Sequence, residues 1–317
     1  MSSVEIAASP SGGLITKAQS GFFTVQDESG PVVCKVRGKL KRGPRDSDLA
    51  TVGDRVAFVR LPDGSGMIDS VLPRTGALVR RRPSPKGRAA RSGESEDRES
   101  VILANPDQAV FVFACADPAP HLGMLDRFLV VAEANHIPAI VCANKIDLVQ
   151  AETARALFGG YAAIGYTVIF TSAATGEGIE PLRARLAGKL SALAGPSGVG
   201  KSSLLNAIQP GLGISVRRVS QATQKGRHTT VHPELIPLAG GGWVADTPGI
   251  RALALHDIDP YELDGYFPDL LPFVSQCGFS DCSHKHEAGC AVQAAVARGE
   301  VQARRYESYL RIREGQF

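Results

Sequence analysis

The sequence predicts a multidomain protein with an N-terminal β-barrel, a central α/β domain and a C-terminal α-rich domain. Three observations support this prediction. Residues 12–75 hold short alternating segments separated by Gly, Pro and Asp turns, which is typical of a small antiparallel β-domain. Residues 101–255 alternate apolar strand patterns with helical patterns, as a doubly wound sheet does. Residues 256–317 contain a cluster of Cys and His residues, followed by a single predicted helix from about Val292 to Arg313 that is rich in Ala, Arg and Glu.

Composition is that of a soluble globular chain. The 317 residues are 44% hydrophobic, which is enough for two or three ordinary buried cores. No run of about 18 apolar residues occurs, and the N-terminus lacks the basic and then apolar pattern of a secretory signal. We therefore expect a cytoplasmic protein with no membrane partner. The net charge of +3 says little about nucleic-acid binding, because the distribution of charge matters more than its sum.

The N-terminal domain is expected over residues 1–79. Strand-like segments such as 21–26, 32–37 and 55–59 allow about five strands, which suits an OB-fold barrel. An SH3-like barrel fits the same pattern and stays open as an alternative. OB-folds commonly bind nucleic acid, so we interpret this domain as RNA-binding.

A charged linker is predicted over residues 80–100. It has no hydrophobic period, and a basic half precedes an acidic half. Two interpretations remain open: a solvated tether, or an arm that becomes ordered when it contacts RNA.

The central domain is expected over residues 101–255. Apolar runs at 108–114, 138–143 and 167–170 are typical of buried parallel strands, and helical patterns lie between them. Another apolar run leads into Gly195, and a helix is predicted from Lys201 to Ile208.

A phosphate-binding loop follows that apolar run. Its glycines let successive N–H groups turn inward, and the next helix adds its positive N-terminal end. Lys201 is expected to reach the β- and γ-phosphates, and the Ser202 hydroxyl to bind Mg²⁺. The predicted nucleotide contacts are Gly195, Pro196, Ser197, Gly198, Val199, Gly200, Lys201, Ser202 and Ser203.

A guanine-recognition motif, Asn144-Lys145-Ile146-Asp147, follows an earlier buried strand. The Asp147 carboxylate can accept two parallel N–H bonds from guanine, which adenine cannot offer. We expect Lys145 to pack over the base plane, and Ser172 and Ala173 to complete the pocket through backbone contacts. In ordinary Ras-like GTPases the phosphate loop precedes this motif, so the reversed order here indicates a circularly permuted GTPase domain.

Residues on the γ-phosphate side are predicted from two further segments. Asp246-Thr-Pro-Gly249 ends a strand, where Asp246 would hold Mg²⁺ through water and the Gly249 N–H would contact the γ-phosphate. In the segment Gly226-Arg-His-Thr-Thr we choose Thr230, rather than Thr229, as the Mg²⁺ ligand that senses the γ-phosphate. Position 250 is Ile, which cannot orient an attacking water as a glutamine does, so His228 becomes the candidate for that role. Two alternatives stay open: His228 is an ordinary surface histidine in a loop, or a ribosomal group orients the water.

The remaining motif is a Cys/His cluster. Cys277, Cys282, His284 and Cys290 offer three thiolates and one imidazole, which suits one structural tetrahedral Zn²⁺ per monomer. His286 is an alternative to His284, and a chance cluster of free thiols is the competing interpretation. The spacing does not match common iron–sulfur runs. Cys34, Cys115 and Cys142 lie singly in apolar stretches and are expected to be small buried hydrophobes.

The combination of a β-barrel, the GPSGVGKSS, GRHTT, DTPG and NKID motifs, and the Cys/His segment resembles the RsgA (YjeQ) family of GTPases that depend on the small ribosomal subunit. The resemblance covers nearly the whole chain. It implies a late maturation factor whose partners are GTP or GDP and the small ribosomal subunit with its rRNA, and whose slow hydrolysis the subunit stimulates. We also expect a monomer. His228 matches the histidine proposed for catalysis in the family. The charged linker and Pro196, where family members often have Gln, are departures from the family pattern.

Two other functions are weighed against a GTPase. An RNA-binding scaffold would use the nucleotide only as a structural ligand, whereas Lys201, Ser202 and Asp246 favour hydrolysis. An ATP-dependent small-molecule kinase would also use a phosphate loop but would not need Asp147. Because the strand that carries Asp246 leads directly into the Cys/His segment, we expect rearrangement around the γ-phosphate to act on that segment.

Overall fold

The structure of the chain, a computed structural model, describes residues 11–38, 49–81, 99–214, 234–246 and 258–316. The described residues form two compact units. One draws on residues 1–107, 186–192 and 227–252, and the other on residues 108–185, 193–226 and 253–317.

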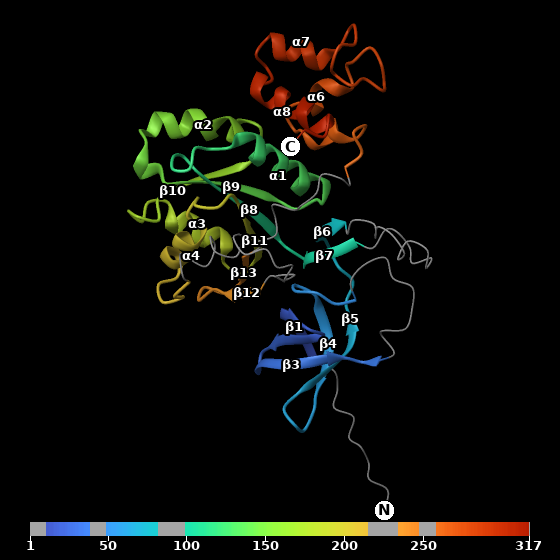
Figure 1. The fold of residues 1–317 in the computed structure, drawn as a ribbon, viewed down its shortest axis with the longest axis vertical. Helices are drawn as coiled ribbons and strands as arrows, with labels where there is room; N and C mark the ends of the chain where they lie inside the picture. The colour runs from blue at the N-terminus through green and yellow to red at the C-terminus, as the bar shows by residue number, and fades with distance from the viewer. Residues whose placement is uncertain (1–10, 39–48, 82–98, 215–233, 247–257, 317) are drawn as a thin grey trace, which may run out of the picture. The chain divides into compact units, whose positions relative to one another are not determined.

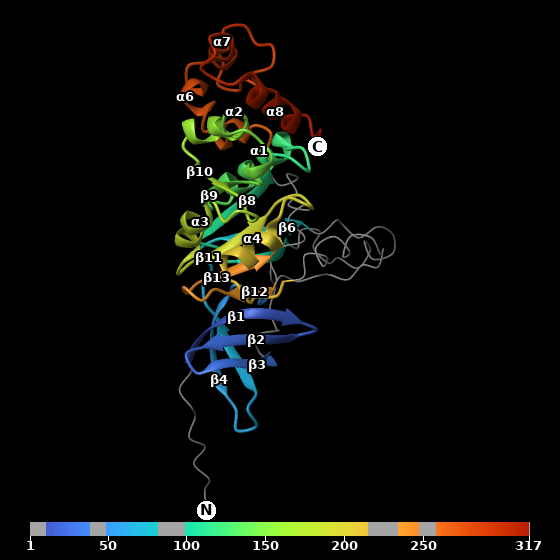
Figure 2. The same cartoon turned by 90° about the vertical axis from the view of Figure 1, so that its left-hand side faces the viewer.

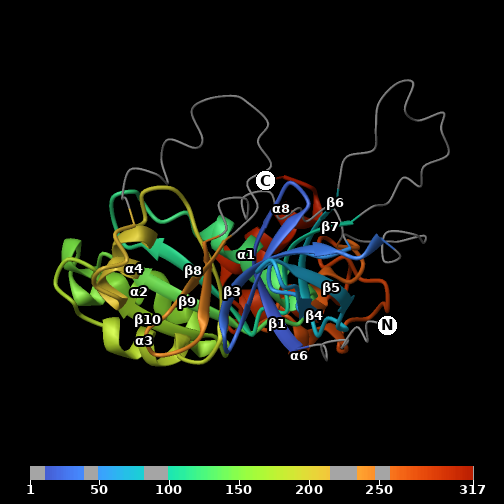
Figure 3. The same ribbon diagram turned by 90° about the horizontal axis from the view of Figure 1, so that it is seen from below.

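The first unit contains a closed five-stranded barrel. Its strands are β1 (Ser11–Gln19), β2 (Phe22–Asp27), β3 (Gly30–Val36), β4 (Arg55–Arg60) and β5 (Gly66–Val71). They are joined in the order β1-β2-β3-β5-β4, and β1 also pairs with β4. The β3–β5 pair is parallel and the others are antiparallel. This is an OB-like Greek-key barrel, as predicted (Figures 2 and 3).

The barrel core follows from alternation along the strands. In β3 every second side chain is buried, which places Val32, Cys34 and Val36 inside. They pack with inward residues of the other strands, including Phe58 and Ile68, which are fully buried. Burial raises the pKa of the Cys34 thiol to about 11, so the thiol is protonated at neutral pH. Cys115 and Cys142 are also buried, as expected for small hydrophobes.

A two-stranded antiparallel sheet follows the barrel. Strand β6 (Ala77–Arg81) pairs with β7 (Glu99–Ala104). The ends of the predicted 80–100 linker therefore belong to strands, and its middle, residues 82–98, lies outside the described residues.

The α/β part has strands β8 (Gln108–Ala114), β9 (Ala139–Asn144), β10 (Thr167–Thr171), β11 (Leu190–Ala194), β12 (Glu234–Pro237) and β13 (Trp243–Asp246). The sheet order is β10-β9-β8-β11-β13-β12. Strands β8, β9 and β10 are parallel, and β12 pairs antiparallel to β13. Every residue of β8 is buried, which explains its continuous apolar run.

Helices cover both faces of β8, β9 and β10. Helices α1 (Leu122–Ala134) and α2 (Ala151–Ala163) lie on one face, and α3 (Ile179–Leu186) and α4 (Lys201–Ile208) on the other (Figure 1). Phe128 of α1 packs against Phe111 and Phe113 of β8, with ring centroids 5.4 and 6.1 Å apart. The predicted doubly wound arrangement is confirmed. Because parallel strands end at a common edge, the loops after β9, β10 and β11 gather the nucleotide motifs there.

The C-terminal segment is helical and belongs to the second unit. It contains the short helices η6 (Leu263–Tyr266) and α6 (Leu271–Val274), then α7 (Ala291–Ala297) and α8 (Ala303–Arg313). The prediction of a single helix over 292–313 is wrong, because the helix is interrupted between α7 and α8. Gly299 adopts φ +77° and its N–H donates to the Val296 carbonyl, which ends α7 with the left-handed residue that glycine favours.

Candidate functional site

The phosphate loop runs from the end of β11 to the start of α4. Gly195, Gly198 and Gly200 have φ angles of +152°, +81° and +97°, which other residues rarely adopt. A Cβ on Gly195 would lie 2.1 Å from the Val112 carbonyl oxygen of β8, so the loop begins in backbone contact with the sheet. The glycines that the motif supplies are therefore sterically required.

Lys201 folds back over this loop. Its side chain is 8% exposed, and Nζ donates to the carbonyl oxygens of Gly195 at 2.9 Å and Pro196 at 2.8 Å. Ser202 follows in the first turn of α4 and is also buried. The ammonium group thus lies on the concave side of the loop, where the backbone N–H groups and the α4 N-terminus favour an anion.

Asn144, the last residue of β9, connects the guanine motif to the phosphate loop. It is 1% exposed; its Nδ2 donates to the Val199 carbonyl at 2.8 Å, and its Oδ1 accepts from the Thr171 hydroxyl at 3.1 Å. A Cβ on Gly200 would lie 2.5 Å from that Nδ2. Asn144 therefore holds β9, β10 and the phosphate loop together. Sequence reasoning did not anticipate the parts played by Thr171 and Val199.

Asp147 is exposed, and Ser172 orients it. The fully buried Ser172 hydroxyl donates to Asp147 Oδ1 at 2.5 Å and accepts the N–H groups of Ala174 and Thr175 at 3.2 and 3.1 Å. The prediction that Ser172 and Ala173 contact the base through their backbone stays a prediction, and the Ser172 side chain has the additional part of orienting Asp147. Ala173, beside it, is half-buried at the same strand end.

Lys145 is held beside the same edge. It adopts φ +62°, and its Nζ donates to the Asp117 carbonyl oxygen in the loop after β8. Three strand ends thus contribute residues to one edge of the sheet: Asp117 follows β8, Lys145 follows β9 and Ser172 follows β10. An aromatic base in contact with Lys145 and Asp147 would lie across these loops.

The γ-phosphate side lies largely outside the described residues. Asp246 ends β13, at the strand end that the sequence predicted, and the structure describes only its backbone. His228, Thr230 and Gly249 fall outside the described ranges. Their roles stay predictions.

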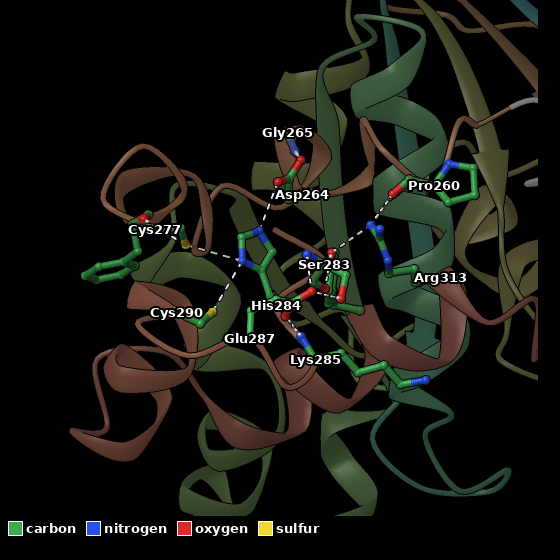
Figure 4. Close-up of polar contacts among 12 residues, drawn as sticks. Pro260, Asp264, Gly265, Cys277, Ser283, His284, Lys285, Glu287, Cys290 and Arg313 are labelled. Atoms are coloured by element: carbon green, nitrogen blue, oxygen red, sulfur yellow. Dashed lines mark hydrogen bonds and ion pairs between the residues drawn. The ribbon is translucent and has the colours of Figure 1, made fainter. Parts of the chain in front are cut away.

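The Cys/His cluster is assembled in the C-terminal segment (Figure 4). One ligand atom from each of Cys277, Cys282, His284 and Cys290 lies within 4.8 Å of the others. His284 Nδ1 is 3.5 Å from the sulfur atoms of Cys277 and of Cys290. His286 is exposed and outside this set, so the geometry favours His284 as the imidazole ligand.

This geometry suits a tetrahedral ion. With metal–ligand distances of about 2.0–2.3 Å, the ligand atoms of a tetrahedral Zn²⁺ are roughly 3.3–3.8 Å apart. The two separations between His284 Nδ1 and sulfur already lie in that range, and the widest, up to 4.8 Å, would have to contract by about 1 Å. Three thiolates and one imidazole leave no open position for a substrate, so such an ion would be structural.

Asp264 orients His284, the candidate imidazole ligand. Its Oδ2 lies 3.0 Å from His284 Nε2, which leaves Nδ1 pointing at the sulfur atoms (Figure 4). Burial alone would raise the pKa of Asp264, but the contact with His284 outweighs it and lowers the pKa. Glu287 holds the ligand loop, because it accepts hydrogen bonds from the backbone N–H groups of Ser283, Lys285 and His286. Sequence reasoning had not singled out Asp264 or Glu287.

A buried ionic cluster joins α8 to α1 and α2. Asp126 of α1 accepts from Arg305 at 2.8 Å, Arg304 at 2.7 Å and the Tyr161 hydroxyl at 2.7 Å. Arg305 is 2% exposed and also forms a bidentate pair with Asp269 at 3.1 and 2.7 Å. We call Asp126, Tyr161, Asp269, Arg304 and Arg305 the α8 clamp. It fixes the C-terminal segment to two helices of the nucleotide-binding domain.

Comparison with known families decides the assignment. Residues 71–256 match the model of the RsgA GTPase, and residues 12–68 match that of the RsgA N-terminal domain. The chain belongs to the RsgA GTPase family. The resemblance inferred from its motifs is thereby confirmed, as is a GTPase domain preceded by an OB-like barrel.

Curated relatives match nearly full length. A protein of Gemmatimonas aurantiaca named small ribosomal subunit biogenesis GTPase RsgA is 45% identical over 305 residues, covering 95% of this chain and 96% of its own. The protein of the same name from Thermotoga maritima is 39% identical over 305 residues, covering 95% of each chain.

Solved structures of similar proteins support the same family assignment. The crystal structure of YjeQ from Thermotoga maritima superposes with a TM-score of 0.76 at 36% identity, covering 97% of this chain and 98% of the other. YloQ, described as a circularly permuted GTPase, gives 0.74 at 35% identity, covering 98% and 96%. Among the described residues of this RsgA family member, no helix is both long and apolar enough to cross a membrane.

Proposed function

We propose that this chain is a GTPase that binds the small ribosomal subunit during its late maturation and hydrolyses GTP to GDP and phosphate, with turnover stimulated by the subunit. The bond from Asn144 to the Val199 carbonyl carries the nucleotide part of the proposal, because it joins the guanine motif to the phosphate loop at one sheet edge. The ribosomal part rests on relatives named small ribosomal subunit biogenesis GTPase.

The described residues supply binding and orientation. The carboxylate of Asp147, held by the Ser172 hydroxyl, would accept the guanine N1–H and amino group. The Lys201 ammonium would exchange its bonds with the loop carbonyls for bonds with the β- and γ-phosphates. Guanine selection by Asp147 argues against an ATP-dependent kinase.

Magnesium fits the donor set around the phosphates. Ser202 and Thr230 would ligate the ion directly and Asp246 through water, and the ion would neutralise charge on the phosphate oxygens. His228 would orient the attacking water in place of the glutamine that Ile250 replaces.

The barrel offers a surface suited to rRNA. Phe22 of β2 is 46% exposed, and the Lys35 ammonium of β3 lies 5.0 Å from its ring centroid. Val33, two residues before Lys35, is 53% exposed. An exposed aromatic ring beside a cation on neighbouring strands can stack an unpaired base and bind its phosphate. Strands β2 and β3 are also where OB-folds take oligonucleotides.

The C-terminal segment is proposed to hold one structural Zn²⁺ and to report the nucleotide state. Because the α8 clamp ties it to α1 and α2, a shift of these helices would move the zinc site with them. We propose a cytoplasmic monomer, in keeping with its relatives' role in subunit biogenesis.

Co-sedimentation with purified small ribosomal subunits tests the partner. We expect the chain to sediment with the subunit when bound to a non-hydrolysable GTP analogue and to release it with GDP. Replacing Phe22 by Ala should weaken binding about tenfold, since one stacking contact contributes about 1–3 kcal/mol. Leu148→Ala, at another exposed apolar residue, is the matched control. No binding in either nucleotide state would reject the ribosomal partner.

A further inference from the structure

A cavity of 290 Å³ lies between α1 and α8, separate from the predicted nucleotide site. Its lining includes His121, which caps the N-terminus of α1, Arg127 of α1, and Ser308 and Arg311 of α8. None of the phosphate-loop or guanine-motif residues contributes to it. Neither the GTPase motifs nor the zinc ligands account for this cavity.

The polar lining is basic. His121, Arg127 and Arg311 contribute to it, and no Asp or Glu does. His121 Nδ1 accepts the Met124 N–H at 3.1 Å, which leaves the proton of the neutral ring on Nε2 as a donor. The thirteen-residue α1 begins beside His121 and adds the partial positive charge of its N-terminus. Together these groups favour an anionic ligand.

The rest of the lining is apolar. Met124 and Ile312 face the cavity, one from each helix. A free inorganic anion would leave these side chains uncovered, whereas a phosphate ester carries an organic part that can bury them. The cavity volume is near the lower end of the range for small-molecule sites, which suits one nucleotide unit rather than a larger cofactor.

Gly123 provides a way to fill the cavity without changing its charge. A Cβ at Gly123 would lie 3.8 Å from His121 Cε1 and 4.0 Å from Ser308 Oγ, which is ordinary contact. A small side chain is therefore tolerated, and a longer one would extend among the lining residues.

We propose that the α1–α8 cavity is a second anion site that binds the phosphate ester of one pyrimidine-sized nucleotide unit, held by Arg127, Arg311 and His121. The ligand has two sources with the same chemistry, a free mononucleotide or a phosphodiester of bound RNA. Because the site spans α1 and α8, a bound ligand would stabilise the packing of α8 against α1, which the α8 clamp also stabilises.

The test uses the full chain saturated with GDP and Mg²⁺, so that the phosphate loop is occupied. The ¹³C-labelled histidine ring signals are followed by NMR during titration with 5′-UMP, inorganic phosphate or a short oligouridine RNA, and His121 is assigned with His121→Gln. We expect a saturating shift of the His121 signal. A shift with UMP identifies a mononucleotide site, and a shift with RNA alone identifies a backbone-phosphate site.

Variants distinguish binding in this cavity from a general electrostatic attraction of anions to the protein. Arg311→Ala should weaken the ligand about tenfold or more, as expected for the loss of one charge-assisted hydrogen bond. Gly123→Leu should block binding with every cation kept. Arg185→Ala, which removes an exposed cation of α3 far outside the lining, should change affinity less than about twofold. A His121 signal unmoved by both UMP and the RNA, unchanged affinity in Gly123→Leu, or inorganic phosphate bound as tightly as the better of UMP and the RNA would overturn the proposal.

Discussion

Removing the carboxylate of Asp126 should destabilise the attachment of α8 to the nucleotide-binding domain. Asp126 is fully buried and is the common acceptor for Arg304, Arg305 and the Tyr161 hydroxyl. Burial alone would lower the pKa of Arg305, but the carboxylates of Asp269 and Asp126 outweigh it and raise the pKa. The guanidinium therefore stays charged and depends on both partners.

The loss of folding stability expected for Asp126→Ala follows from the burial of the ion pairs. Breaking a buried ion pair by removing one partner costs about 3–5 kcal/mol. Arg305 keeps its bidentate pair with Asp269 after Asp126→Ala, so we expect the lower end, about 3 kcal/mol. The pair with Arg304, whose side chain is 35% exposed, should contribute no more than about 1 kcal/mol of this loss. Asp126→Asn keeps the volume and one acceptor, and should cost about 2 kcal/mol.

The assay is denaturant unfolding combined with hydrogen exchange of the α8 amides. Double-mutant cycles should give a larger coupling energy for Asp126 with Arg305 than for Asp126 with Arg304. Glu307→Gln is the control, because it removes an exposed carboxylate from the same helix and should change stability by less than about 0.5 kcal/mol. Equal coupling to both arginines, or unaltered α8 exchange in Asp126→Asn, would refute the idea that burial makes this cluster strong.

Three further outcomes test the individual sites. Asp147→Asn should raise the Kd for GTP about tenfold or more, measured with a fluorescent guanine nucleotide, since charged hydrogen bonds contribute about 1.5–3 kcal/mol each; unchanged affinity would remove Asp147 from guanine recognition. Asp264→Asn should weaken zinc binding about 10–100-fold in a chelator competition, because Asp264 orients the ligand His284, and retained affinity would make that contact incidental. His228→Ala should abolish subunit-stimulated turnover while GTP binding is kept; normal stimulated turnover would reject its catalytic role.

The glycines of the phosphate loop and the Cys/His cluster could be predicted from the sequence because the chemistry of such motifs requires particular residue types at short spacing. Gly195 and Gly200 are needed where the loop approaches backbone or side-chain atoms, so the glycines are visible in the sequence itself. Cys277 and Cys290 lie close enough along the chain to suggest a shared ion. The OB-like barrel followed from strand alternation, and its closure through the parallel β3–β5 pair came only from the structure.

Long-range contacts were not predictable from the sequence. Asp126 and Arg305 are 179 residues apart, and an Arg in a helix rich in charge is usually on the surface. Asp264 lies 20 residues before His284, in a separate short helix. The break between α7 and α8 did have a local signal, because Gly299 is a typical residue just beyond a helix C-terminus.

Phosphate release tests the central claim most directly. Turnover of GTP and of ATP should be measured with and without purified small ribosomal subunits. We predict slow hydrolysis of GTP alone, strong stimulation by the subunit, and no comparable turnover of ATP. Stimulation absent with GTP, or equal for both nucleotides, would contradict a guanine-specific GTPase activated by the small subunit.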